Sequence, residues 1–302
     1  MSGTAFVTGA TGFLGCWIVK RFLEAGWRVG AFDRVLNFDR VRLVFGEMPT
    51  RYVTWMCGDV AEMTGLRQAM EQSKPDVVVH LAAALIPLCR AQPAAAASVN
   101  VTGHINVFEA ARNLGVRRIV YASSVASRSR TETGALSTAY GAFKLWSEEY
   151  AAVCFEQHGI SSIGLRPDIV YGPGRQSGET AFVNAAIDDV ANGRSHLIKR
   201  RWSMRLEYVE EVAEVFFRCA ASPFEGAYGS DVTAEVTNEE DLMRALRHTV
   251  GDCRVSCQPS EPFLRSPAAD LRPVNAIIGD WRHVPLAEGV QRTIEQIRIA
   301  RA

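Results

Sequence analysis

Residues 8–15 read Thr-Gly-Ala-Thr-Gly-Phe-Leu-Gly and directly follow the apolar run Ala-Phe-Val at residues 5–7. A short buried strand that enters a glycine turn and then an amphipathic stretch, here residues 13–25, is how a Rossmann unit presents a helix N-terminus to a pyrophosphate. Gly9 suits a sharp turn, Gly12 leaves room for phosphates, and Gly15 lets the helix lie close to the strand. The spacing is Gly-x-x-Gly-x-x-Gly rather than the commoner Gly-x-Gly-x-x-Gly. The stretch predicts a bound dinucleotide.

The composition is that of a globular protein with small-molecule partners. The chain has 302 residues, 48% of them hydrophobic, which suffices for one large domain or two unequal ones. Lys plus Arg and Asp plus Glu both total 33, so a net charge of +0 gives no field to attract nucleic acid or an anionic membrane. Because the sequence shows no signal segment or membrane-spanning run, we expect a cytoplasmic protein. The 7 cysteines favour reduced, mostly buried thiols, and we expect no metal.

Strand-like and helical patterns alternate through the first half of the chain. We expect strands at residues 4–8, 28–32, 52–57, 77–80, 118–121 and 162–165, and helices at residues 13–25, 65–72, 94–114 and 140–157. This alternation predicts an α/β fold, a doubly wound parallel sheet with helices on both faces. Beyond Pro167, helical patterns dominate at residues 180–192, 209–221, 239–250 and 286–299. We expect a Rossmann domain at residues 1–166, which binds NAD, and a smaller, mostly helical substrate-binding lobe at residues 167–302, from which the chain crosses back to the core.

Acidic residues follow two of the expected strands. Asp33 ends the second strand, roughly 20 residues past the glycine turn, where a carboxylate can accept hydrogen bonds from the adenosine ribose. This favours NAD, although Arg34 beside it is able to hold the phosphate of NADP, and Asp33 can also serve as a turn cap. Asp59 follows the third strand and can bond the adenine edge while Val60 packs on the ring; alternatively Asp59 caps the next helix.

Small residues close the fourth expected strand. Ala82 and Ala83 come after His80 and Leu81, and small side chains at the carboxyl end of a strand leave room for a cofactor. His80 itself is interpreted as a core histidine whose hydrogen bonds are satisfied.

A tyrosine and a lysine one helical turn apart are the catalytic candidates. Tyr140 and Lys144 open an expected helix and face the same way, so the ammonium can favour the phenolate and lower the pKa of the tyrosine. Tyr140 then becomes a general acid or base for a substrate hydroxyl or carbonyl. Ser124, at the end of the neighbouring strand, can hydrogen-bond the same oxygen. An isolated Tyr-x-x-x-Lys pair is common in helices, but the dinucleotide turn upstream favours the catalytic interpretation.

These motifs together resemble the extended short-chain dehydrogenase/reductase superfamily, within the NAD-dependent epimerase/dehydratase family. The resemblance covers nearly the whole chain and rests on residues 8–15, 33, 58–60, 80–83, 100–103, 123–124, 140–144, 165–174 and 209–213. It implies that Tyr140 exchanges a proton with substrate, that Lys144 also binds the nicotinamide ribose, and that Ser124 orients the carbonyl. It further implies that Asn100 supports the fourth and fifth strands, and that the protein is a homodimer formed through the helices of Tyr140 and of residues 94–114.

The resemblance also assigns binding residues. The cofactor is expected against Gly9, Thr11, Gly12, Phe13, Leu14, Gly15, Asp33, Arg34, Asp59, Val60, Leu81, Ala82, Ala83, Asn100, Tyr140, Lys144, Pro167, Ile169 and Val170. The substrate is expected against Ala84, Ser124, Val125, Arg175 and Arg205.

Three departures from the family pattern narrow the function. Val125 follows Ser124 where dehydratases carry an Asp-Glu pair, and Ile169 stands where nucleotide-sugar epimerases have an asparagine for the phosphates. Met204 occupies the offset of an arginine that contacts the diphosphate in many relatives, and Arg205 comes one position late. The basic run at residues 199–201 is either an anion site or a solvated loop.

These departures favour an NAD(P)-dependent oxidoreductase that acts on a secondary alcohol or ketone of a sugar, sugar acid or hydroxy acid. The alternative is a nucleotide-sugar epimerase with tightly bound NAD. A non-catalytic NAD(P)-sensing protein is the third hypothesis, and the intact Ser124, Tyr140 and Lys144 argue against it.

Overall fold

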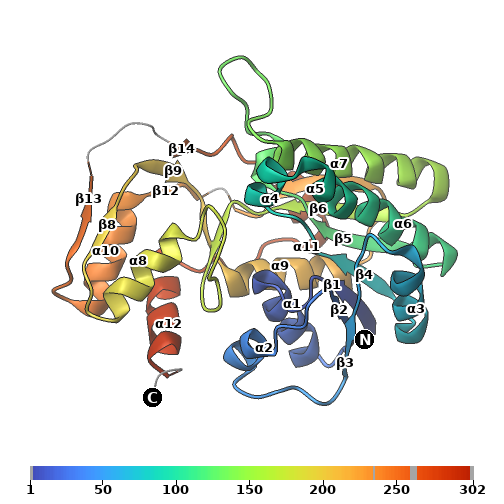
Figure 1. Ribbon diagram of the computed structural model, residues 1–302, viewed down its shortest axis with the longest axis horizontal. Helices are drawn as coiled ribbons and strands as arrows, with labels where there is room; N and C mark the ends of the chain where they lie inside the picture. Colours follow the sequence, from blue (N-terminus) through green and yellow to red (C-terminus); the bar gives the residue numbers. More distant parts are fainter. Residues whose placement is uncertain (1–2, 234, 259–263, 300–302) are drawn as a thin grey trace.

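The computed structural model describes residues 3–233, 235–258 and 264–299. A seven-stranded parallel sheet forms its centre, with the strand order β11-β6-β5-β4-β1-β2-β3 (Figure 1). The strands are β1 (Thr4–Thr8), β2 (Arg28–Asp33), β3 (Val53–Cys57), β4 (Val77–His80), β5 (Arg118–Ala122), β6 (Ser161–Arg166) and β11 (Ala227–Asp231). The chain runs outward from β1 to β3 and then restarts on the other side of β1 at β4. This switch point, at the carboxyl ends of β1 and β4, is where open α/β sheets bind ligands.

Helices cover both faces of the sheet, which confirms the predicted doubly wound α/β fold. On one face Cys16 of α1 (Phe13–Glu24) and Phe216 of α9 (Val209–Ala221) join a single apolar core. On the other face a second core contains Leu66, Phe108 and Cys154. Those three residues come from α3 (Met63–Ser73), α6 (Gly103–Asn113) and α7 (Ala139–His158). Three helices were not predicted: α2 (Phe38–Phe45), α4 (Ile86–Ala91) and α11 (Arg272–Ile278).

The helix expected at residues 94–114 is interrupted. It consists of α5 (Pro93–Ala97), a π-helical turn at Ser98–Thr102 and α6. The π turn carries Asn100, and a helical periodicity cannot reveal one wide turn because the residues on either side keep a similar pattern.

The C-terminal part lies beside the sheet and has its own apolar core (Figure 1). Its helices are α8 (Phe182–Ala191), α10 (Glu239–Val250) and α12 (Leu286–Ile299). Short strands that were not predicted pair within it: β7 (Ile169–Tyr171) with β10 (Leu206–Tyr208), β9 (Trp202–Met204) with β12 (Thr237–Asn238) and β14 (Leu264–Arg265), and β8 (His196–Ile198) with β13 (Val255–Cys257). Strands of two or three residues are too short to show an alternating pattern.

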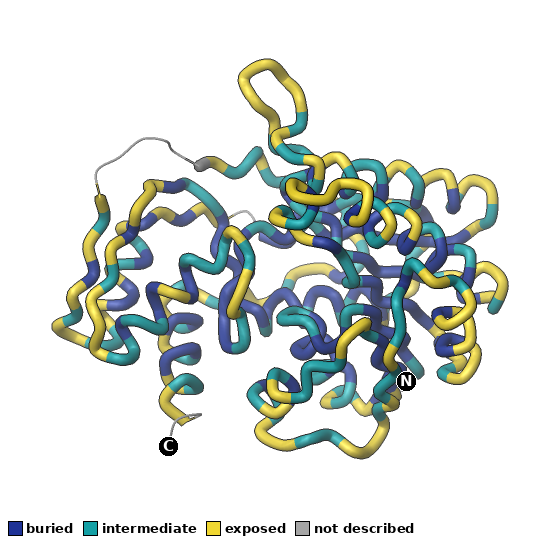
Figure 2. Tube along the Cα trace, in the orientation of Figure 1, coloured by how far each residue is buried: buried dark blue, intermediate teal, exposed yellow. Residues whose placement is uncertain are grey.

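The chain returns from the C-terminal part to the sheet. α9 packs in the same core as α1, β11 pairs with β6, and α11 (Arg272–Ile278) contributes Val274 to that core. The division into residues 1–166 and 167–302 stays a prediction. Buried segments run through both parts, and the loop that enters α7 projects into solvent (Figure 2). Within the described residues, no helix combines the length and hydropathy that crossing a bilayer requires.

Candidate active site

The glycine turn between β1 and α1 fits a pyrophosphate. Gly9 has a φ of +68°, and a Cβ there would lie 2.8 Å from the backbone nitrogen of Ala82, two residues after β4. A Cβ at Gly15 would lie well under 3.0 Å from the carbonyl oxygen of Gly9. Gly12 is the N-cap of α1 and offers no side-chain hydrogen bond to the first amides of the helix. Those amides are therefore available to an anion.

Asp33 holds this turn in place. Its carboxylate accepts hydrogen bonds from the backbone N–H of Thr11 (2.9 Å), the Thr11 hydroxyl (2.8 Å) and the backbone N–H of Arg34 (2.8 Å). Asp33 therefore serves as the turn cap that was the alternative interpretation. A carboxylate has about four acceptor sites, so these three hydrogen bonds still leave one for a ribose hydroxyl. The Arg34 side chain is exposed. Arg40, which the sequence did not single out, donates to the carbonyl of Thr11 at 2.8 Å and to that of Gly174 at 3.2 Å.

Hydrogen bonds from Asp59 and Asn106 hold the loop after β3 in place. The Asp59 carboxylate accepts from the backbone N–H of Ala61 at 2.9 Å, so it organises the turn that leads into α3. Asn106 donates to the carbonyls of Val60 (2.9 Å) and Ala61 (3.0 Å). Val60 is buried, and a Cβ at Gly103 would meet its side chain at 2.7 Å. Contacts of Asp59 and Val60 with adenine stay predictions.

The segment after β4 is held by a histidine and an asparagine. His80 Nδ1 lies 2.7 Å from the hydroxyl of Thr8, and burial lowers the pKa of His80 to about 3, so it is a neutral core residue. Asn100 accepts from the backbone N–H of Ala84 at 2.7 Å and donates to its carbonyl at 2.9 Å. Asn100 therefore supports the segment that follows β4, rather than β4 and β5 themselves. Leu81, Ala82 and Ala83 lie between these two anchors and are half-buried.

Tyr140, Lys144 and Ser124 come together at the carboxyl end of β5. The Lys144 ammonium lies 5.6 Å from the centroid of the Tyr140 ring and donates to the carbonyl of Ala122, the last residue of β5, at 2.5 Å. Ser124 hydrogen-bonds Tyr140, and its hydroxyl also accepts from the backbone N–H of Ala126 at 3.2 Å. The Tyr140 phenol thus has the Ser124 hydroxyl as a hydrogen-bond partner and the Lys144 ammonium over its ring.

Burial dominates the electrostatics of this group. It lowers the pKa of Lys144 to about 8 and raises the pKa of Tyr140 to about 12. The hydrogen bond from Ser124 and the charge of Arg175 lower the pKa of Tyr140 only in part. The prediction that the Lys144 ammonium lowers the pKa of Tyr140 toward the working pH was wrong, because burial takes the phenol out of water and Lys144 is not among the groups that lower its pKa.

A close backbone contact sets the distance between Ser124 and Tyr140. Ser124 caps the 3₁₀ turn Val125–Ser127, while Thr138 caps α7 by accepting from the backbone N–H of Gly141 at 3.0 Å. A Cβ at Gly141 would lie well under 3.0 Å from the carbonyl oxygen of Ala126. Only glycine at this position lets the helix and the turn meet so closely.

Arg175 lies over the ring of Phe13 and acts electrostatically on Tyr140. It donates to the carbonyl of Val170 and to the hydroxyl of Thr180, and its guanidinium carbon lies 5.6 Å from the centroid of the Phe13 ring. Burial lowers the pKa of Arg175 to about 10, and its charge acts on Tyr140. Its Nε is buried without a hydrogen-bond partner.

Other predicted site residues are buried. Arg205 is 1% exposed; it donates to the carbonyl of Pro267 and lies 3.9 Å from Asp231. Ala84 and Val125 are buried too, and the Val125 N–H donates to the carbonyl of Pro167 at 3.3 Å. Two of the residues assigned to the cofactor, Ile169 and Val170, lie in β7 and are buried, and Leu14 is half-buried in α1.

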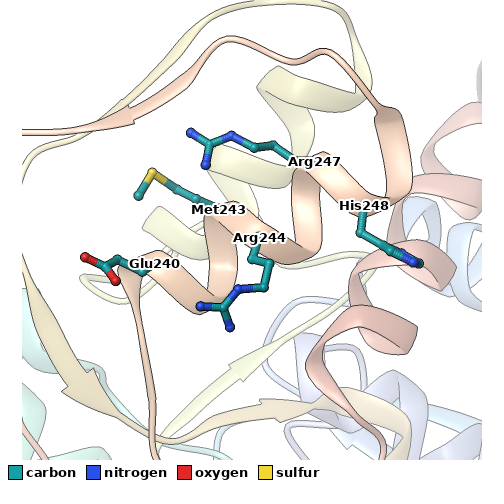
Figure 3. A pocket seen from close by; sticks show the side chains of 5 residues that line it. All are labelled: Glu240, Met243, Arg244, Arg247 and His248. Carbon is teal, nitrogen blue, oxygen red and sulfur yellow. The ribbon is translucent and has the colours of Figure 1, made fainter.

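A surface hollow of about 640 Å³ lies elsewhere, on α10 (Figure 3). Glu240, Met243, Arg244, Arg247 and His248 line it from one helix. Arg244 pairs with Asp241 at 3.0 Å and Arg247 donates to the carbonyl of Val255 at 3.1 Å. The hollow contains none of the predicted site residues, so it is not the candidate active site.

Comparison with known proteins agrees with this geometry. The model of the NAD dependent epimerase/dehydratase family matches residues 5–233. The chain belongs to this family. The resemblance seen in the motifs is therefore confirmed, together with the prediction of an enzyme of the extended short-chain dehydrogenase/reductase type whose cofactor is NAD.

Three named proteins are similar to this chain over nearly the whole length of both partners. The UDP-glucose 4-epimerase of Mycolicibacterium smegmatis is 30% identical over 97% of both chains. The structure of Thermus thermophilus UDP-glucose 4-epimerase in complex with NAD aligns with a TM-score of 0.80 and 25% identity, covering 98% of this chain and 99% of the other. A UDP-N-acetylglucosamine 4-epimerase from Methanobrevibacter ruminantium shares the fold, with a TM-score of 0.85, 20% identity and coverage of 100% and 99%.

Proposed function

We propose that this enzyme is a nucleotide-sugar 4-epimerase that retains NAD through the catalytic cycle. The juxtaposition of Tyr140, Ser124 and Lys144 at the carboxyl end of β5 carries the proposal. Full-length similarity to a UDP-glucose 4-epimerase supports the epimerase hypothesis over the net oxidoreductase favoured by the motif departures.

The residues present divide the chemistry between them. When bound, NAD would supply the hydride acceptor for the sugar carbon and the hydride donor that restores it from the opposite face. The Tyr140 oxygen takes the proton of the sugar hydroxyl as the ketone forms and gives it back when the ketone is reduced. Ser124 donates to the same sugar oxygen. Its hydrogen bond and the charge of Arg175 favour the phenolate form of Tyr140, while the Lys144 ammonium would hold the nicotinamide ribose.

We also propose roles for the flanking residues. Thr11, Phe13, Leu14 and the glycines of the turn would hold the pyrophosphate, with Asp33 on the adenosine ribose. Arg175 would face the phosphates of cofactor or substrate, since its Nε lacks a protein partner. The cofactor site would be completed by Arg34, Asp59, Val60, Leu81, Ala82, Ala83, Pro167, Ile169 and Val170, and the substrate site by Ala84 and Val125. Arg205 is enclosed beside Asp231, so we do not assign it to the substrate site.

A homodimer through α7 and α6 belongs to the same proposal. Val153 on α7 is 46% exposed, and Trp146 stacks on Tyr150 at a centroid distance of 5.1 Å on the same helix. Light scattering should therefore give twice the monomer mass of 33.2 kDa. A monomer at micromolar concentration would count against the dimer.

The decisive experiment offers UDP-galactose and, separately, UDP-glucose to the purified enzyme without added NAD. Chromatography should show the same equilibrium mixture from both directions, with no accumulation of free NADH. Tyr140→Phe should lower the rate of interconversion by about 10³-fold. In a separate assay with NAD added, steady NADH accumulation from a sugar alcohol or hydroxy acid, together with no epimerisation, would instead establish the net oxidoreductase.

A further inference from the structure

Glu148 lies on α7 one turn beyond Lys144, on the same face as the catalytic pair. The spacing from Tyr140 to Lys144 to Glu148 is four residues each time, so the three side chains line one side of the helix. The Glu148 carboxylate is 10% exposed. Glu148 contacts the turn that carries Ser124, so a largely buried negative charge lies near Ser124 and Lys144.

Four donors converge on this carboxylate. It accepts from the hydroxyl of Ser123, from the hydroxyl of Ser127 at 3.1 Å, and from Arg166 through Nε at 2.8 Å and through Nη2. Ser123 and Ser127 are 3% and 0% exposed, so without Glu148 their hydroxyls would be buried without this partner. Arg166 is 12% exposed and ends β6.

The two serines bracket the turn that carries Ser124. Ser123 directly precedes Ser124, and Ser127 is the last residue of the 3₁₀ turn. One carboxylate thus holds both ends of the turn against α7, which also carries Tyr140. Gly229 on β11 leaves the space for the ion pair, because a Cβ there would lie 2.8 Å from Glu148 Oε2.

We infer that Glu148 is a positioning residue that clamps both ends of the Ser124 turn to α7, and thereby sets the geometry between Ser124 and Tyr140. Its charge also favours the protonated form of Lys144. Only the expected effect on kcat rests on the proposed function. The attachment of the Ser124 turn to α7 by Glu148 does not depend on it.

The first test removes the clamp and keeps the ion pair. Ser123→Ala/Ser127→Ala should lower kcat on UDP-galactose about tenfold or more, with KM within twofold, since small displacements of catalytic groups act on kcat. Hydrogen exchange of the amides at residues 125–128 should become faster, because their hydrogen bonds to Pro167, Ser124 and Val125 lose their support. Exchange and kcat both at wild-type values would overturn the inference.

The second test removes the charge. Glu148→Gln should lower kcat and should also move the alkaline fall of kcat to lower pH, because the Lys144 pKa of about 8 then drops further. The double serine variant keeps the Glu148 charge, so the pH at which its kcat falls should match that of the wild type. The other groups that face Lys144 are unchanged in both variants: Cys89 from α4, Tyr140 on α7, His80 from β4 and His104 from α6.

The matched control is Glu149→Gln, one position along the helix and exposed. It should leave kcat, the pH profile and the exchange rates at wild-type values. Equal effects of Glu148→Gln and Glu149→Gln would refute a specific clamp. If the wild type does not interconvert the UDP-sugars, the proposed function fails, while the exchange rates of the double serine variant still decide the clamp.

Discussion

Replacing Gly141 with alanine should separate Ser124 from Tyr140 without touching either side chain. The added Cβ would lie well under 3.0 Å from the carbonyl oxygen of Ala126 and 3.0 Å from its carbon. Both are backbone atoms, so rotation of a side chain cannot relieve the overlap. Reaching an ordinary contact distance of 3.4 Å requires the 3₁₀ turn and α7 to move apart by about 1 Å.

A shift of this size should act mainly on the reaction rate. A catalytic group misplaced by about 1 Å costs roughly 100-fold in rate, or about 2.7 kcal/mol in the barrier. The stability change should be smaller: overpacking costs about 1–3 kcal/mol, and alanine in place of a helical glycine returns up to about 1 kcal/mol. We therefore expect Gly141→Ala to fold, with kcat near one hundredth of the wild-type value.

The assay is chromatographic epimerisation of UDP-galactose, with kcat and KM taken from initial rates and stability from urea unfolding. Gly65→Ala is the matched control, because this glycine lies within α3 and a Cβ there meets nothing within 4 Å. The control should keep its kcat and gain a little stability. A Gly141→Ala variant with kcat within threefold of the wild type would refute the argument that this contact sets the catalytic distance.

Four further predictions concern individual residues. Tyr140→Phe should lower kcat by about 10³-fold while NAD remains bound, measured by epimerisation and by cofactor content. Burial lowers the pKa of Lys144 to about 8, so kcat should fall as pH rises through about 8. Between about pH 8 and pH 10.5 the lysine keeps its proton in the unfolded chain but loses it in the folded protein. The free energy of unfolding of the wild type should therefore rise across this range relative to that of Lys144→Met. Asn100→Ala should cost about 2–4 kcal/mol in urea unfolding, because both backbone groups of Ala84 lose their partner. Asp33→Ser should weaken NAD binding to the cofactor-free enzyme and narrow the preference over NADP; an unchanged ratio of the two affinities would contradict it.

The sheet could be predicted because each inner strand has a recognisable apolar pattern within its own sequence. β4 is Val-Val-Val-His and buried throughout, and β1 is buried from its second residue, so each reads as a short apolar run. β11, with the sequence Ala-Tyr-Gly-Ser-Asp, has no such run. It forms a strand because β6 offers an unpaired edge, and a pattern within five residues does not contain that information.

The site divides in the same way. Tyr140 and Lys144 were found because their spacing is a property of one helix, and the glycine turn because its spacing is a property of one turn. Arg40, Asn106 and Glu148 were missed because each acts on a segment distant in sequence, through hydrogen bonds that no spacing encodes. Such residues become visible only when the fold places donors and acceptors together.

The one-residue offset between Met204 and Arg205 shows how strongly position decides what a charged side chain can do. Met204 ends β9 and is half-buried, whereas the next residue is enclosed, with Asp231 3.9 Å from its guanidinium. Neighbouring residues in an extended segment point to opposite sides, so an arginine that arrives one position late faces the protein instead of the ligand. Arg175, beside Phe13 and electrostatically coupled to Tyr140, is then the better-placed cation for a substrate diphosphate. Under the proposed function, Arg175 would supply the positive charge for the substrate phosphates that many relatives take from the arginine at the usual offset.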